Sequence, residues 1–144
     1  MGGLMQGFRD LRVYNAAFEL AADIHDLSKT FPADESYGLT NQIRRSSRAV
    51  AAIIAEAYRK KRYPKSFVAK LIEADGENTE TQVWLDFCRR FDYLTETKQI
   101  EFVTRSEEIG RMIGAMLNHP EKFSGGTGTP ASRQQTPASG QPGT

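Results

Sequence analysis

The sequence is poor in the residues that usually carry chemistry. Its 144 residues include one cysteine and two histidines. Because Cys88 is alone, no intrachain disulfide can form, and a reducing, cytoplasmic setting is expected. No apolar run approaches the roughly 20 residues of a membrane span. Residues 1–7 also lack the apolar stretch of a signal peptide, so we expect no contact with a membrane.

The motifs of common active sites are missing as well. Di-iron bundles need Glu-x-x-His pairs, and neither His25 nor His119 has a glutamate three residues before it. There is no Gly-rich phosphate loop and no nucleophile elbow. Cys88 falls on an apolar helical stripe, where a free cysteine usually acts as a small buried hydrophobe. We therefore predict no catalytic residue, no metal site, no cofactor and no enzymatic activity.

The composition changes sharply near the C-terminus. Residues 124–144 are Gly, Pro, Ser, Thr, Gln and Ala with one charge, Arg133. No large apolar side chain is present there to offset the entropy of ordering, which predicts a disordered tail. Residues 1–7, rich in glycine, are expected to be a flexible lead-in. Residues 8–123 then form a single domain, large enough to bury an independent core.

Apolar residues recur at helical spacing throughout that domain, and no stretch alternates long enough for a strand. The spacing predicts helices over residues 10–29, from a start between 34 and 40 to 62, over 64–91, and over 97–117. Short connections favour an all-α, antiparallel up-down-up-down four-helix bundle. The expected inner positions include Phe18 on the first helix and Phe91 on the third. On the second they are Leu39, Ile43, Ser46, Ser47, Val50, Ile54 and Ala57.

Some small and polar residues also fall at core spacing on the third helix. Asn78 and Thr81 are expected in a hydrogen-bond network that fixes helix register, because buried polar groups need partners. Gly76, in the middle of the same helix, suggests a close approach of a neighbouring helix.

Charge is unevenly distributed along the chain. The segment 40–70 has nine basic residues and one acid, net +8, whereas 1–39 is net −3 and 71–123 is net −5. Between the basic ends of the second helix, residues 49–57 are apolar on almost every side. A helix that is apolar all round favours burial on more than one face, which predicts a homo-oligomer.

Two groups of basic residues on this helix have different expected roles. Arg44, Arg45 and Arg48 share a face with Ala52 and Ala55, and a face mixing arginine with small apolar residues favours a subunit interface. Phosphate binding is the alternative for that face. For the cluster further along, the order is reversed, and nucleic-acid binding is favoured over a subunit interface. A solvated face is the other alternative for this cluster, whose members are Arg59, Lys60, Lys61, Arg62 and Lys65.

The stretch FPADESYGLTNQIRRSSRAVAAIIAEAYRK resembles a family signature with Phe-Pro, Tyr-Gly-Leu-Thr, Gln-Ile-Arg-Arg and Ile-Ala-Glu-Gly. That family comprises small proteins encoded in intervening sequences of bacterial large-subunit rRNA genes. DLRVYNAAFELAADIHDLSKTFP is similar to the first helix of the family, and ETQVWL and EEIGRMIGAML are similar to parts of its third and fourth. This chain departs from the signature at Ala57, where the family usually has glycine.

The resemblance implies an antiparallel four-helix bundle. It also implies kinship with accessory variability proteins of diversity-generating retroelements, which form five-fold rings and bind nucleic acid and a reverse transcriptase. A pentamer is therefore the preferred oligomer. The first hypothesis is an oligomeric, non-enzymatic bundle that binds RNA or DNA, with RNA favoured, through basic residues of the second helix. The alternative is a structural or protein-partner scaffold whose arginines are used in subunit contacts.

Overall fold

The computed structural model describes residues 7–124, and this part of the chain is all-α, without a strand. Its four long helices are α1 (Arg12–Ser28), α2 (Leu39–Arg59), α3 (Pro64–Arg90) and α4 (Glu96–Asn118). Three short elements accompany them: the 3-10 helices η1 (Phe8–Asp10) and η2 (Ala33–Glu35), and α5 (Glu121–Ser124). The predicted fold class is confirmed. The predicted lead-in and tail lie, apart from Gly7 and Ser124, outside the described residues.

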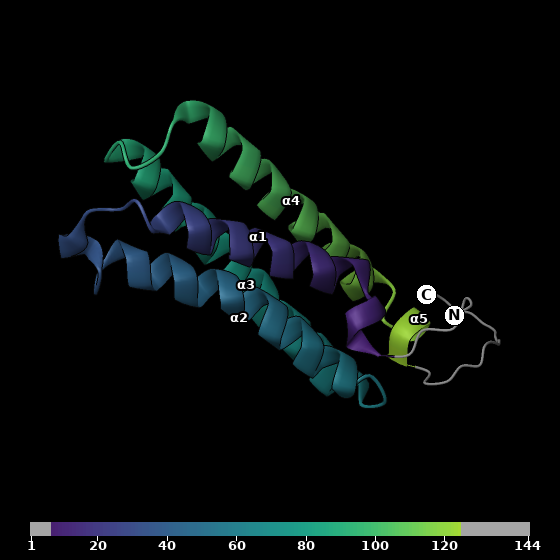
Figure 1. Cartoon of the computed structure of the whole chain (residues 1–144). Helices are drawn as coiled ribbons and strands as arrows, with labels where there is room; N and C mark the ends of the chain where they lie inside the picture. Colours follow the sequence, from purple (N-terminus) through teal and green to yellow (C-terminus); the bar gives the residue numbers. More distant parts are fainter. Residues whose placement is uncertain (1–6, 125–144) are drawn as a thin grey trace.

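The long helices form a bundle in which successive helices run in opposite directions (Figure 1). Helix α1 packs on α2 and α4, and α3 packs on α2 and α4, with the most extensive contact between α2 and α3. This topology places η1, the α2–α3 turn and α5 at one end of the bundle (Figure 1). The α1–α2 and α3–α4 connections lie at the other end.

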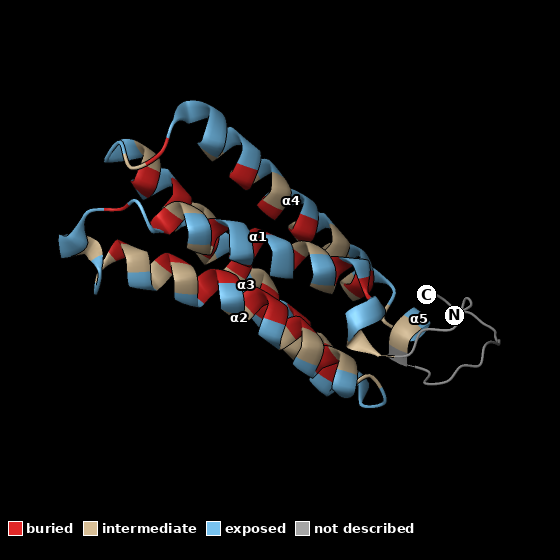
Figure 2. Cartoon of the chain, viewed as in Figure 1, coloured by how far each residue is buried: buried red, intermediate tan, exposed pale blue. Residues whose placement is uncertain are grey.

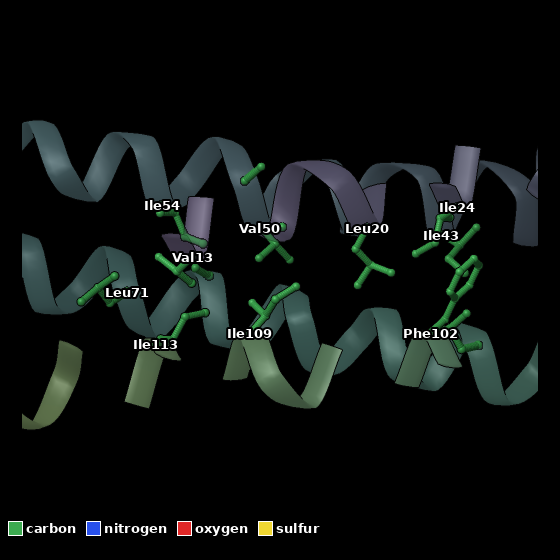
Figure 3. Close-up of a cluster of buried hydrophobic side chains, with 14 of the residues drawn as sticks. Val13, Leu20, Ile24, Ile43, Val50, Ile54, Leu71, Phe102, Ile109 and Ile113 are labelled. Carbon is green, nitrogen blue, oxygen red and sulfur yellow. The ribbon is translucent and has the colours of Figure 1, made fainter. Parts of the chain in front are cut away.

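A continuous apolar core runs between the helices, and residues from all four point into it (Figure 3). Ile24, Ile43, Ile54, Leu71 and Ile113 have no exposed surface. All seven inner positions predicted for the second helix are buried. Figure 2 shows the resulting division of each helix into a buried and an exposed side. Truncating one of these isoleucines would cost about 2–5 kcal/mol, since it removes buried methyl groups and leaves a cavity.

Polar side chains inside the core are satisfied by one another. The Asn78 amide donates to the Ser106 carbonyl at 2.8 Å, and the Ser106 hydroxyl donates to Asn78 Oδ1 at 2.9 Å, which joins α3 to α4. The hydroxyls of Ser46 and Thr81 are 2.8 Å apart and join α2 to α3. Both asparagine and threonine are buried, so the structure has the structural network that their spacing predicted.

Gly76 does not have the role that its position suggested. It is exposed, and a methyl group added there would meet nothing within 4 Å. The close approach of α3 to α4 occurs instead at Gly110, where an added Cβ would lie 3.4 Å from Asn78 Nδ2. The mid-helix position suggested a contact, but Gly76 lies on the solvent face of α3.

Two aromatic residues assigned to the core are on the surface. Phe18 is 51% exposed, because the buried row of α1 is centred on Ala17, Leu20 and Ile24. Phe91 is also exposed, because α3 ends at Arg90 and Asp92 follows with a left-handed φ of 63°. On α1 the adjacent Ala17 is buried instead, and beyond the end of α3 the next buried apolar residue is Leu94.

The start of α2 is fixed by a carboxylate from the preceding 3-10 helix. Glu35 Oε1 accepts from the Leu39 backbone N–H at 2.9 Å, and Glu35 Oε2 accepts from the Tyr93 hydroxyl at 2.7 Å. The bond from Leu39 and then that from Tyr93 lower the pKa of Glu35. A Cβ at Gly38 would lie 2.7 Å from Glu35 Oε1, so the carboxylate can approach only because this residue is glycine. The two connections at this end of the bundle are thereby tied together.

Candidate nucleic-acid interface

The basic end of α2 is a surface at the α2–α3 turn, made of Arg59, Lys60, Lys61, Arg62 and Lys65. Helix α2 ends at Arg59, three residues before the predicted end, because Tyr63 precedes a proline and takes an extended conformation. Pro64 then begins α3. The basic end therefore spans a helix terminus, a turn and the first turn of the next helix (Figure 1).

Four cations of the basic end are exposed and make no ion pair with the residues that the structure describes. These four are Arg59, Lys60, Arg62 and Lys65. Lys61 differs, because its ammonium lies 4.2 Å from the centre of the Tyr58 ring and donates to the Tyr58 hydroxyl at 2.9 Å. Because its side chain packs against the Tyr58 ring, Lys61 is half-buried.

More cations lie at this end of the bundle, because the chain starts and α4 ends there. Arg9 of η1, Arg12 of α1 and Lys122 of α5 are exposed, and η1 packs on α2 (Figure 1). Two acids accompany them, Asp10 and Glu121. These three cations were not among the predicted nucleic-acid-binding residues. The predicted up-down topology could have found them, since it brings residues 8–12 and 118–123 to the α2–α3 turn.

At the start of α2, the arginines are used within the chain. Arg45 Nη2 lies 3.1 Å from Glu77 Oε1 and 2.7 Å from Glu80 Oε2, which ties α2 to α3. Glu80 also accepts from the Trp84 indole N–H at 3.0 Å. Hydrogen bonds from Arg45 to Glu77 and Glu80 raise the pKa of its guanidinium.

Arg44 and Arg48 turn the other way, towards the end of α1. Arg44 Nε donates to Ser28 Oγ at 2.6 Å, and its Nη2 lies 3.4 Å from the His25 carbonyl oxygen. Arg48 Nη2 lies 3.0 Å from His25 Nδ1. Because a guanidinium can only donate, the imidazole nitrogen is the acceptor and His25 is neutral at that position. Burial, followed by the charges of Arg44 and Arg48, lowers the pKa of His25.

A hollow of about 390 Å³ opens beside these arginines. This arginine hollow is lined by Ser36, Thr40, Asn41, Arg44, Arg45 and Arg48. Tyr37, next to Ser36 in the chain, is 96% exposed. The helical spacing predicted that the three arginines share one face. The three neutral polar residues were not predicted, because their positions depend on the conformation of the α1–α2 connection.

The alanines predicted at a subunit interface lie further along α2. Ala52 is exposed and Ala55 is half-buried. The apolar segment around them is covered more fully within one chain than its composition indicated, since Val50, Ala51, Ile54 and Ala57 are all buried. Glu56 beside them pairs with Lys70 of α3 at 3.0 Å.

The residues considered for chemistry do not come together. Cys88 is fully buried, and burial raises the pKa of its thiol to about 12, so the reactive thiolate is suppressed. His25 binds Arg48 near the surface instead. Within residues 7–124, no three His, Cys, Asp or Glu side chains are grouped so that they could hold a metal ion. No helix in this range is long and apolar enough to cross a membrane.

Residues 9–115 match the family described as 23S rRNA-intervening sequence protein. The chain belongs to this family. The matched range covers all of α1, α2 and α3 and most of α4, so it includes both the arginine hollow and the whole basic end. The resemblance seen in the sequence is thus confirmed.

A solved structure from the same group of proteins shares the fold. It is a protein with unknown function from the S23 ribosomal protein family of Bacteroides thetaiotaomicron. The two chains are 27% identical with a TM-score of 0.67, and the match covers 73% of this chain and 97% of the other. A comparison with curated proteins gives no match.

The structure shows what the family signature does in this member of the 23S rRNA-intervening sequence proteins. The Tyr-Gly-Leu-Thr part ends the α1–α2 connection, where Gly38 admits the Glu35 carboxylate. The Gln-Ile-Arg-Arg part supplies Ile43 to the core, and Arg44 and Arg45 fasten α2 to α1 and α3. Much of the signature is therefore used in the packing of the bundle itself.

Proposed function

We propose that this member of the 23S rRNA-intervening sequence family is a non-enzymatic protein that binds nucleic acid through the basic end of α2. The observation that supports this is the set of four exposed cations that have no acidic partner among the described residues. Positive charges held together without counter-charges attract phosphates and release counterions when these bind. Arg9, Arg12 and Lys122, which belong to η1, α1 and α5, are exposed as well.

RNA is the favoured ligand, because the family is named for sequences that interrupt 23S rRNA. Exposed Tyr63 lies between Arg62 and Lys65 and offers a ring on which a base could stack. The proposed contacts are with phosphates and stacked bases, which distinguish sequences poorly. Binding is therefore expected to be strong at low salt and to tolerate changes of sequence.

The test is a salt titration of binding to a single-stranded RNA and to an RNA duplex. The triple variant Lys60→Gln, Arg62→Gln, Lys65→Gln removes three unpaired cations and leaves Lys61 on its ring. The slope of log affinity against log salt should flatten by up to about 0.9 per lost contact on a duplex and about 0.7 on a single strand.

A second triple variant, Lys29→Gln, Lys98→Gln, Arg111→Gln, is the matched control. It removes the same total charge, but each of its cations is already paired with an acid of its own helix. Its salt slope should stay close to that of the unmodified chain. If both triple variants lose the same amount of RNA affinity, the effect comes from net charge alone and the basic end is not the site. If the unmodified chain does not bind RNA at about 50 mM salt, the proposal is refuted.

A scaffold built from several copies is the second candidate. It is favoured by apolar residues that α3 turns to solvent, among them Ile72 at 57%, Val83 at 43% and Phe87 at 44% exposed. The acidic 71–123 segment and the basic 40–70 segment also make different surfaces of one molecule complementary in charge. Arg44, Arg45 and Arg48 already bind within the chain, and of the two alanines of the predicted interface Ala52 is exposed and Ala55 is half-buried.

Solution mass distinguishes the possible interfaces. Light scattering at micromolar concentration should show an oligomer for the unmodified chain, with a pentamer preferred from the family resemblance. Ala52→Glu should dissociate an interface on α2, whereas Phe87→Glu should dissociate one on α3. A monomer for the unmodified chain would exclude the scaffold and leave the nucleic-acid proposal in place.

A further inference from the structure

We propose that the arginine hollow binds a phosphate group through Arg44 and Arg48. The hollow lies at the start of α2, about 16 Å along the helix from the basic end, as eleven residues separate Arg48 from Arg59. It is therefore a second site, which does not depend on the proposed role of the basic end.

The three arginines of the hollow differ in how their charge is balanced. Arg45 faces two carboxylates, those of Glu77 and Glu80, at 3.1 Å or less. Arg44 and Arg48 contact only neutral groups: a hydroxyl, a backbone carbonyl and an imidazole. Two positive charges therefore face a cavity with no carboxylate in its lining.

Two of the nearby acids are already engaged elsewhere. Asp26, which acts on His25, pairs with Lys29 at 3.4 Å. Glu35 accepts from Leu39 and Tyr93. Burial lowers the pKa of His25 most, and the charges of Arg44 and Arg48 lower it further because both oppose its protonation, which is consistent with a positive field here.

Both guanidiniums are held in place before a ligand arrives. A guanidinium has five N–H donors, and the contacts to Ser28 and His25 use two on Arg44 and one on Arg48. The remaining donors are available, and fixing the side chains in advance lowers the entropy cost of binding. The forked geometry of arginine suits the oxygens of a phosphate better than a point charge does.

Neutral groups complete the site. The hydroxyl of Thr40 and the amide of Asn41 can donate to further phosphate oxygens, whereas the Ser36 hydroxyl already donates to the Ala33 carbonyl at 2.7 Å. The volume leaves room for part of the group attached to the phosphate, and exposed Tyr37 could stack with a base.

Arginine side-chain NMR on the full chain gives a direct test. Inorganic phosphate is titrated at constant ionic strength, with chloride as the balancing anion. The Nε–H signals of Arg44 and Arg48 should shift and saturate at one site. Arg48→Gln, an exposed position, should weaken phosphate binding by about tenfold or more, as expected for the loss of a charge-assisted contact. Arg62→Gln is the matched control and should leave the affinity unchanged.

Shifts that do not saturate, or equal effects of Arg48→Gln and Arg62→Gln, would overturn the proposal. Adenosine 5′-monophosphate and short oligonucleotides with and without a 5′-phosphate then identify the source of the phosphate. If both oligonucleotides compete with phosphate, the site binds the phosphates of a nucleic-acid backbone. If only the phosphorylated oligonucleotide competes, the site binds a chain end. If neither competes, the ligand is a free phosphate or a nucleotide. The triple variant of the basic end should still bind phosphate in the arginine hollow. Failure of the phosphate proposal can therefore be told apart from failure of nucleic-acid binding at the basic end.

Discussion

Helix α2 carries arginines near both ends, and the two groups have different surroundings. Near its start, Arg44, Arg45 and Arg48 donate to α1 or α3 of the same chain. At its end, Arg59 and Arg62 meet no carboxylate among the described residues. A guanidinium that is tied to its own chain contributes to stability, and it stays available to a ligand only where its partners are neutral and leave some of its donors unused, as for Arg44 and Arg48. A guanidinium without a partner is available to a ligand outright. The same residue type can thus be assigned to folding or to binding only when its neighbours are known.

The largest effect on stability is expected at Arg44, at the start of α2. Arg44→Ala removes the bonds to Ser28 and to the end of α1, and it should lower the free energy of unfolding by about 1.5 kcal/mol. That value is at the lower end for hydrogen bonds from a charged donor, since the side chain is only half-buried. Arg62→Ala should stay within about 0.5 kcal/mol of the unmodified chain. Urea denaturation measures both, and equal losses would abolish the distinction.

Gly38 tests whether the start of α2 depends on the Glu35 cap. Gly38→Ala places a methyl group where the carboxylate lies, and loss of the cap should cost about 1 kcal/mol. Gly76→Ala is the opposite control, because this exposed mid-helix position has open space and should gain roughly 0.5–1 kcal/mol. Thermal unfolding should show melting temperatures shifted in opposite directions. A neutral Gly38→Ala would mean that the cap contributes nothing.

Arg45 is expected to contribute less than Arg44 despite its two acidic partners. Its side chain is half exposed, and solvent-exposed ion pairs add at most about 1 kcal/mol. Arg45→Gln should therefore lower stability by less than Arg44→Ala, and the difference from the unmodified chain should shrink as salt is added. Urea denaturation at low and high salt measures this. A loss larger than that for Arg44→Ala would reverse the proposed order.

The smallest expected effect is a pH dependence from His25. Its pKa is lowered from 6.5 in the folded chain, so the unfolded chain binds the proton more readily. The contribution of neutral His25 is present above pH 6.5 and is lost as pH falls below it. His25→Gln should flatten the dependence of the free energy of unfolding on pH between pH 7.5 and 5.5. His119→Gln, at the opposite end of the bundle, should leave that dependence unchanged. Parallel profiles for His25→Gln and the unmodified chain would contradict this.

The sequence predicts the bundle well because helix periodicity and burial depend on the same spacing. All seven inner positions of α2 are buried as expected, and Thr95 caps α4 by accepting from the Lys98 N–H at 3.1 Å. Phe18 was assigned to the core incorrectly, because two adjacent apolar rows compete for the inside and periodicity alone does not choose between them. Phe91 was assigned incorrectly for a different reason, because α3 ends at Arg90, one residue before it.

The candidate site could be predicted only in part. Clustering in the sequence was enough to find the basic end, since its five members fall within seven consecutive residues. The partners of Arg44, Arg45 and Arg48 lie 16 to 35 residues away, on α1 and α3. Which arginine leans towards which helix depends on the rotation of α2 in the bundle, and a charge pattern does not specify that rotation.

The burial of Cys88 has a practical consequence for measuring how the bundle opens. With no exposed surface and a pKa of about 12, this thiol is shielded from alkylating reagents while α3 stays packed. As the chain has one cysteine, the rate of labelling reports how often that part of the core becomes accessible. A cysteine placed at Tyr63 would by contrast react at once, which gives a fast reference signal in the same molecule and a place to attach a fluorophore beside the basic end.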